Sequence, residues 1–106
     1  MGDPMRIRAL ARPGGIEIRA LIAHPMESGQ RRDDAGNLVP AWYITDVEVR
    51  VNDRVVMKAA WGTAISKDPR LVLRVKNAAA GDRVRISWVD THGDRRSDEA
   101  RVAAAS

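Results

Sequence analysis

Apolar and polar residues alternate along most of this chain, and that alternation constrains the fold more than any other feature of the sequence. In residues 83–88, Val84, Ile86 and Trp88 occupy every second position and polar side chains fill the others. A period of two places the apolar set on one side of a β-strand. No segment convincingly shows the period of an amphipathic helix. Similar runs predict about seven short strands, near residues 5–10, 16–22, 42–51, 55–57, 71–75, 83–88 and 95–102.

Short turn signals separate these runs and indicate antiparallel neighbours. Asn52-Asp53 is predicted to form a two-residue hairpin turn, and Gly93 suits a left-handed position in the turn Thr91–Asp94. A chain of 106 residues is near the usual size of one domain. We therefore expect residues 1–106 to form one all-β domain, an immunoglobulin-like antiparallel β-sandwich of about seven strands. A small barrel is the alternative.

Cysteine is absent from the chain. Its absence excludes a thiol nucleophile, a disulfide framework and any cysteine-ligated zinc or iron–sulfur centre in this chain. No apolar stretch approaches the length of a membrane span, so we expect no membrane partner. The first six residues have no apolar signal core, which predicts that the chain has no signal peptide of its own.

The chain has a formal net charge of +4, and arginine outnumbers lysine by fifteen to three. Arginine binds carboxylates and oxyanions through paired hydrogen bonds, which suits it to contacts with other molecules. A positive charge also raises the question of nucleic-acid binding. The basic residues, however, are spread among acidic ones and fall at outward positions of the expected strands. We interpret them as a solvated face, not as a nucleic-acid site.

The longest interruption of the strand pattern spans 18 residues, from His24 to Ala41. Loops of this length are uncommon in compact domains and are usually functional or disordered. A loop of varied composition on a rigid sandwich is a recognition element by default. Its first nine residues are rich in chemically capable side chains: His24, Pro25, Met26, Glu27, Ser28, Gly29, Gln30, Arg31 and Arg32.

A hydrolase is one possible interpretation of this loop. It would use Ser28 as the nucleophile, His24 as the base, and Asp33 or Asp34 to orient the base. Ser28, however, does not lie in a nucleophile elbow, and one loop positions catalytic groups poorly. The hydrolase interpretation is therefore weak.

A metal site is a second interpretation, and it would combine His24 and His92 with Glu27 and the aspartates. The spacing of these residues matches no recognised ligand motif. Simpler roles are favoured: His24 ends a strand, where the ring of Pro25 keeps it extended, and His92 is a polar turn residue.

The tryptophans are expected to differ in their surroundings. Trp88 shares a strand face with Val84 and Ile86 and is predicted to lie in the core. Trp61 falls where the strand pattern fails, so a partly exposed Trp61 would be a plausible interface anchor.

The chain also resembles a known protein family over nearly its whole length, and the loop carries the most specific part of the resemblance. His24 to Arg31, followed by Asp34, Gly36, Asn37 and Pro40, closely resembles the hallmark of the SoxZ family. The similarity extends through other positions at compatible spacing: Ile44, Asn52, Val55, Ala64-Ile65-Ser66, Pro69, Trp88-Val89-Asp90 and Gly93.

The resemblance implies an immunoglobulin-like scaffold subunit that is not catalytic and holds no cofactor. It implies a tight heterodimer with SoxY, whose cysteine near the end of a C-terminal arm carries the sulfur substrate covalently during thiosulfate oxidation. Other Sox enzymes would make transient contacts with this complex. It further implies export to the periplasm together with SoxY, which bears the signal peptide. The expected partner-binding residues are His24 to Arg32 and Trp61.

The sequence leaves several alternatives open. The His24–Arg32 loop could face SoxY or the visiting enzymes, and either face of the sandwich could meet SoxY. An isolated chain could form a homo-oligomer through an unoccupied interface. The competing function is a stand-alone immunoglobulin-like binding module for an acidic partner or nucleic acid, based on the positive charge.

Overall fold

The computed structural model describes residues 2–104, which form seven β-strands and contain no helix. The all-β prediction is confirmed. None of the described residues forms a helix with the length and apolar character needed to cross a membrane. The strands are β1 (Arg6–Arg12), β2 (Gly15–Leu21), β3 (Ile44–Val51), β4 (Arg54–Ala60), β5 (Arg70–Lys76), β6 (Arg83–Asp90) and β7 (Arg95–Arg101).

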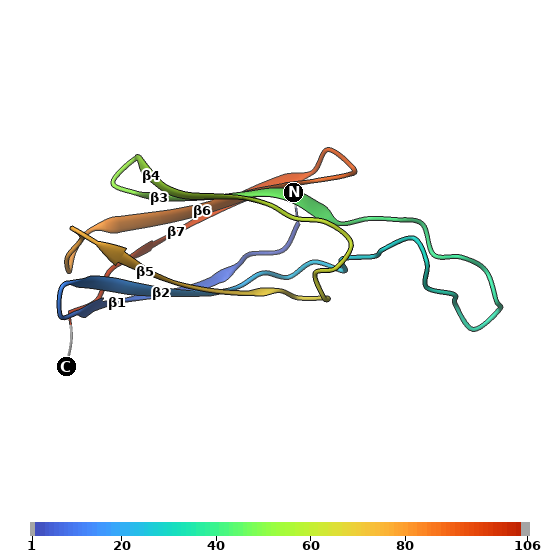
Figure 1. Cartoon of the computed structure of the whole chain (residues 1–106), viewed down its shortest axis with the longest axis horizontal. Helices are drawn as coiled ribbons and strands as arrows, with labels where there is room; N and C mark the ends of the chain where they lie inside the picture. Colours follow the sequence, from blue (N-terminus) through green and yellow to red (C-terminus); the bar gives the residue numbers. More distant parts are fainter. Residues whose placement is uncertain (1, 105–106) are drawn as a thin grey trace.

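The strands form two antiparallel sheets that lie face to face (Figure 1). One sheet has the order β1-β2-β5 and the other has the order β4-β3-β6-β7. The chain therefore crosses between the sheets after β2, β4 and β5, which is an immunoglobulin-like arrangement. The predicted sandwich is confirmed. A parallel bridge between Leu10 and Ala103 joins the two sheets at one edge, but β4 and β5 do not pair at the other edge, so the alternative of a closed barrel is wrong.

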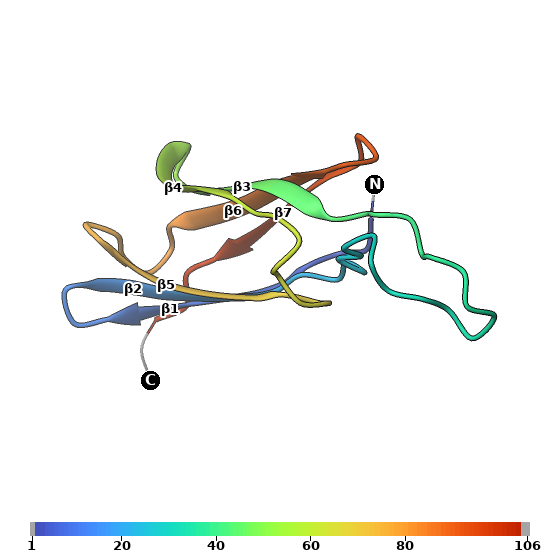
Figure 2. The ribbon, with the colours of Figure 1, turned by 45° about the vertical axis from the view of Figure 1, so that its right-hand side comes forward.

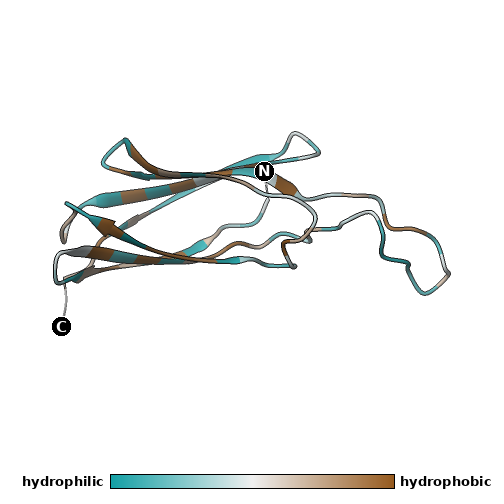
Figure 3. Ribbon diagram, viewed as in Figure 1, coloured by the Kyte–Doolittle hydropathy of each residue, from teal (hydrophilic) through white to brown (hydrophobic). Residues whose placement is uncertain are grey.

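The core lies between the sheets and follows the alternation of the sequence. Ile16, Ile18 and Ala20 project inward from β2 and are buried. Val84, Ile86 and Trp88 do the same from β6, as predicted. Figure 3 shows apolar and polar segments alternating along the strands, as a half-buried strand requires.

The hairpin turns also agree with the sequence prediction. Asn52 and Asp53 both have positive φ angles, of 49° and 68°, which matches the two-residue turn between β3 and β4. Gly93 has a φ of 80° in the turn between β6 and β7. Strand β4 is longer than expected because it pairs with β3 as far as Ala60.

The 18-residue gap is not a loose loop. Its chain leaves the sandwich at one end, runs outward and returns beside itself (Figures 1 and 2). We call residues 26–42 the arm. The long axis of the molecule measures 51 Å against 24 and 20 Å for the other two, because the arm extends beyond the sheets.

Candidate functional site

Backbone hydrogen bonds join the outgoing and returning chains of the arm. At its base, Glu27 and Trp42 exchange two N–H···O bonds, of 2.7 and 2.9 Å. Further out, the N–H of Val39 donates to the carbonyl of Arg31 at 2.8 Å, and Arg32 forms a bridge with Leu38. These contacts give the arm a defined shape, which the sequence analysis had left undecided.

The tip of the arm is a side-chain-stabilised turn. The carboxylate of Asp33 accepts hydrogen bonds from the backbone N–H groups of Ala35 and Asn37, both at 2.9 Å. Gly36 follows with a φ of 85°, which glycine adopts without strain. The guanidinium of Arg32 donates to the carbonyl of Gly36 at 2.7 Å. Arg32 therefore folds back on the tip and stabilises the turn.

His24, the first residue of the predicted recognition loop, lies in the interior with 4% of its surface exposed. Its Nδ1 accepts a hydrogen bond from the N–H of Met26 at 3.1 Å, and its Nε2 lies 2.9 Å from Oδ2 of Asp90. Because Nδ1 is an acceptor, the proton lies on Nε2, which donates to Asp90. Both ring nitrogens are thus engaged inside the protein.

Asp90 ends β6 and receives hydrogen bonds from three separate segments of the chain. In addition to His24, the indole N–H of Trp42 donates to Oδ2 at 2.8 Å. The backbone N–H groups of His92 and Asp94 donate to Oδ1 at 2.9 and 3.0 Å. Burial by itself would raise the pKa of Asp90, but these hydrogen bonds to the charged form outweigh it and lower the pKa.

Stacked and edge-on rings complete this cluster. Trp42 lies parallel to His92, with ring centroids 4.5 Å apart, and His24 meets the rings of Trp42 and Trp88 edge-on. We call His24, Trp42, Trp88, Asp90 and His92 the anchor cluster. It fixes the base of the arm to the end of the sandwich.

Met26 is also buried, so it belongs to the base of the arm and not to its surface. Its sulfur accepts a hydrogen bond from the N–H of Ile44 at 3.3 Å. The side chains of His24 and Met26 therefore serve to hold the arm. Direct contact with a partner would fall to the other residues of the predicted set, which are partly or fully exposed: Pro25, Glu27, Ser28, Gly29, Gln30, Arg31 and Arg32.

A shallow hollow of about 320 Å³ lies between the base of the arm and the link from β4 to β5. The link is tied down by His24 and Asp68, which exchange two hydrogen bonds of 3.0 Å. The hollow joins the first part of the arm to a second stretch that the family resemblance had singled out, Ala64-Ile65-Ser66. Its lining is Pro25, Met26, Glu27, Ser28, Arg31, Thr63, Ala64, Ile65, Ser66 and Lys67.

Two cations, Arg31 and Lys67, line this hollow, and they differ in their ion pairing. The guanidinium of Arg31 forms a salt bridge with Glu27 at 2.9 Å, and hydrogen bonding to that carboxylate raises the pKa of Arg31. Lys67 is exposed and has no ion-pair partner among residues 2–104. The hollow therefore offers one free ammonium together with the hydroxyls of Ser28, Thr63 and Ser66, groups that can bind an anion.

Trp61, the predicted interface anchor, lies at the end of β4 and is half-buried. Its backbone N–H donates to the carbonyl of Thr45 at 2.8 Å, and its side chain packs against the core. Its intermediate burial agrees with the partial exposure considered from the sequence, and its role as an anchor stays a prediction.

The catalytic and metal interpretations find no supporting geometry. Ser28 accepts a hydrogen bond from the N–H of Gln30 at 3.2 Å, while both ring nitrogens of His24 are bonded elsewhere. His24 is therefore not positioned to act as the base for Ser28. Among residues 2–104, no group of three or more histidines, aspartates and glutamates is arranged to hold a metal ion.

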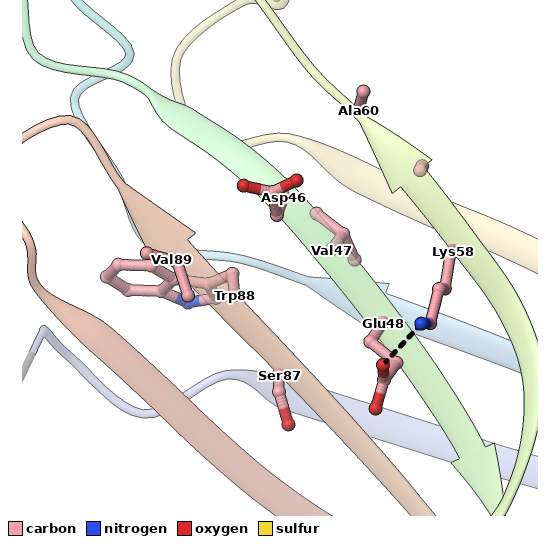
Figure 4. Close-up of a pocket in the computed structure, with 9 residues that line it drawn as sticks. Asp46, Val47, Glu48, Lys58, Ala60, Ser87, Trp88 and Val89 are labelled. Atoms are coloured by element: carbon pink, nitrogen blue, oxygen red, sulfur yellow. Dashed lines mark ion pairs between the residues drawn. The ribbon is translucent and has the colours of Figure 1, made fainter.

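A second depression lies on the outer face of the four-stranded sheet, over β3, β4 and β6 (Figure 4). Lys58 and Glu48 form an ion pair of 3.8 Å across it, and Ser87 lies beside them. Its volume is about 540 Å³, but it has mixed charge and is wide and shallow. We regard it as a solvated part of the sheet.

The sequence could have indicated part of the anchor cluster. Asp90 follows Val84, Ile86 and Trp88 at the same spacing of two, so a carboxylate stands at an inward position. An acid in phase with buried residues predicts a hydrogen-bonded structural role. No comparable signal identifies Trp42, because its partner Asp90 lies 48 residues away.

Comparison with known protein families gives a match over most of the chain. The model of the family described as "Sulphur oxidation protein SoxZ" matches residues 5–101, nearly the whole chain. Among curated proteins, none matches the chain significantly.

Proposed function

The chain belongs to the SoxZ family of sulfur oxidation proteins, and on this basis we propose that it is the non-catalytic scaffold subunit of a SoxYZ carrier complex. In this role it binds SoxY, whose cysteine carries the sulfur intermediates of thiosulfate oxidation, and helps to present them to the other Sox enzymes. The match over residues 5–101 is the observation that carries the proposal.

The residues of the chain support a scaffold role. With no cysteine, the chain has no thiol on which a sulfur intermediate could be held. The histidine that first suggested catalysis is buried and fully hydrogen-bonded. We propose that the chain holds no cofactor of its own, that it is exported to the periplasm with SoxY, and that without SoxY it can form a homo-oligomer.

The arm and the hollow at its base are the proposed recognition elements. The anchor cluster presents the arm in one orientation, so little conformational entropy is lost when a partner binds. Lys67 and the hydroxyls of the hollow suit an anionic sulfur group carried on a partner's chain. We propose that this hollow receives the sulfur-bearing end of SoxY while the outer part of the arm contacts visiting enzymes.

The test uses purified SoxY and the pathway enzymes that act on it. Lys67→Ala changes an exposed residue of the hollow, and Gln30→Ala changes an exposed residue of the arm. Lys58→Ala, on the outer face of the four-stranded sheet, is the control. We expect Lys67→Ala to lower turnover of SoxY-bound sulfur, and Gln30→Ala to weaken capture by the enzymes. If both variants matched Lys58→Ala in turnover and in binding to SoxY, the arm and the hollow would be excluded as recognition elements.

A further inference from the structure

The outer face of the β1-β2-β5 sheet carries an unusual concentration of positive charge. The strand register places its outward residues in four rows across the sheet. The rows, each read from β1 through β2 to β5, are Arg6–Leu21–Arg70, Arg8–Arg19–Val72, Leu10–Glu17–Arg74 and Arg12–Gly15–Lys76. We call these twelve residues the basic face. It forms the side of the lower layer in Figure 2 that points away from the other sheet.

This face contains seven cationic side chains and one carboxylate, that of Glu17. The rest of the chain holds eleven cations and thirteen carboxylates, so its net charge is negative. The net positive charge of the protein therefore comes from this one face. The outward positions of these arginines on strands were predicted from the sequence, but their gathering on one sheet was not.

Most of these cations remain available. Glu17 accepts salt bridges from Arg12, Arg19 and Arg74 at 3.5, 3.3 and 3.8 Å. Among residues 2–104, no carboxylate lies within ion-pair distance of the other four cations, which are Arg6, Arg8, Arg70 and Lys76. Like charges this close repel one another, so an acidic partner would relieve a repulsion that the free protein contains.

Apolar side chains lie in the middle of the basic face. Val72 is 60% exposed, more than any other large apolar side chain among residues 2–104. With Leu21 it lines a hollow of about 220 Å³ whose rim includes Arg6, Arg8 and Arg70. An apolar centre with an arginine rim is the usual composition of a protein–protein contact surface.

We propose that the basic face is the docking surface for an acidic protein that binds transiently. A second copy of this chain is disfavoured there because the two faces would have the same charge. A single-stranded nucleic acid is disfavoured because the face has no aromatic side chain on which bases could stack, and the test includes a DNA duplex as the competing ligand. Permanent subunit interfaces are more apolar than this face, whereas charge steers short-lived encounters.

This proposal is independent of the arm and does not require the carrier function. The test compares wild type with Arg8→Glu/Arg70→Glu on the basic face. The matched control is Arg54→Glu/Arg101→Glu, which makes the same change in net charge at exposed positions of the other sheet. The probes are a short poly-L-glutamate peptide, a DNA duplex and purified SoxY, and backbone amide shifts in NMR spectra locate each contact.

We expect the Arg8→Glu/Arg70→Glu variant to lose about tenfold in affinity for poly-L-glutamate at low salt, with the control nearly unchanged. Shifts should map to β1, β2 and β5, and the difference should vanish at high salt. Equal losses in both variants would show a general charge effect and overturn the proposal. Tighter binding of DNA than of poly-L-glutamate at this face would also overturn it. So would a loss of SoxY binding in Arg8→Glu/Arg70→Glu that the control variant does not show. Failure of wild type to bind SoxY would refute only the carrier function.

Discussion

Nε2 of His24 and Oδ2 of Asp90 lie 2.9 Å apart in the interior of the sandwich, at the point where the arm begins. The two residues are 66 positions apart in the sequence, and their bond joins the chain that follows β2 to the end of β6. The sequence suggested His24 as a catalytic base, but its bond to Asp90 gives it a structural role. It also makes the orientation of the arm depend on one carboxylate.

Replacing Asp90 by asparagine should therefore destabilise the protein. Asparagine has nearly the same shape but lacks the charge, and its NH₂ group would face donors that now point at a carboxylate oxygen. We expect the free energy of unfolding to fall by about 2–4 kcal/mol, measured by urea denaturation. Asp34→Asn, at the exposed tip of the arm, is the control and should have no measurable effect. A similar loss in both variants would contradict the role of Asp90.

The same carboxylate predicts how stability changes with pH. Its folded-state pKa lies below the ordinary value of 3.8, so the unfolded chain takes up a proton at higher pH than the native protein does. The contribution of Asp90 is complete above that ordinary value and is lost as the pH falls through the lowered pKa. Unfolding curves below about pH 4 should show stability decreasing, and the gap between wild type and Asp90→Asn should narrow. A gap that stays constant down to the lowest pH would refute this assignment.

Glu17 should stabilise the basic face in a salt-dependent way. Burial opposes its ionisation, yet hydrogen bonding and the charges of Arg19, Arg12 and Arg74 lower its pKa. Glu17→Gln removes the one negative charge among seven cations, so we expect a lower melting temperature at low ionic strength. Added salt screens the remaining repulsion and should bring the variant close to wild type. A deficit that is the same at all salt concentrations would point to packing instead.

Two adjacent glycines, Gly14 in the turn between β1 and β2 and Gly15 at the start of β2, should respond differently to alanine. A Cβ at Gly15 would overlap the carbonyl oxygen of Val75 on the neighbouring strand, so the backbone must move. A Cβ at Gly14 meets no atom within 4 Å, and only its φ of 84° resists the change. Thermal unfolding should show a cost of at least about 2 kcal/mol for Gly15→Ala and about 1 kcal/mol for Gly14→Ala. The reverse order would show that β2 and β5 are paired differently.

Local patterns in the sequence predicted the sandwich well. The alternation of Val84, Ile86 and Trp88 identifies both the strand and its buried face, because successive side chains of a strand point to opposite faces. The positive φ angles of Asn52 and Asp53 were likewise predictable from the residue types.

Features that depend on distant segments were not predictable in this way. Glu27 pairs with Trp42 across the arm, and nothing near either residue indicates that partner. The basic face arises because β5 joins β2 and not β4, which brings Arg70 into the same row as Arg6. A single sequence shows which residues point outward, but not which strands become neighbours.

The most direct test of the central claim is to mix the chain with purified SoxY whose cysteine already carries labelled sulfur covalently, then measure the mass of the complex and the position of the label. We predict a stable one-to-one heterodimer with a dissociation constant below the micromolar range and with all covalent sulfur on SoxY. No complex between two folded proteins, or label on the cysteine-free chain, would contradict the scaffold function.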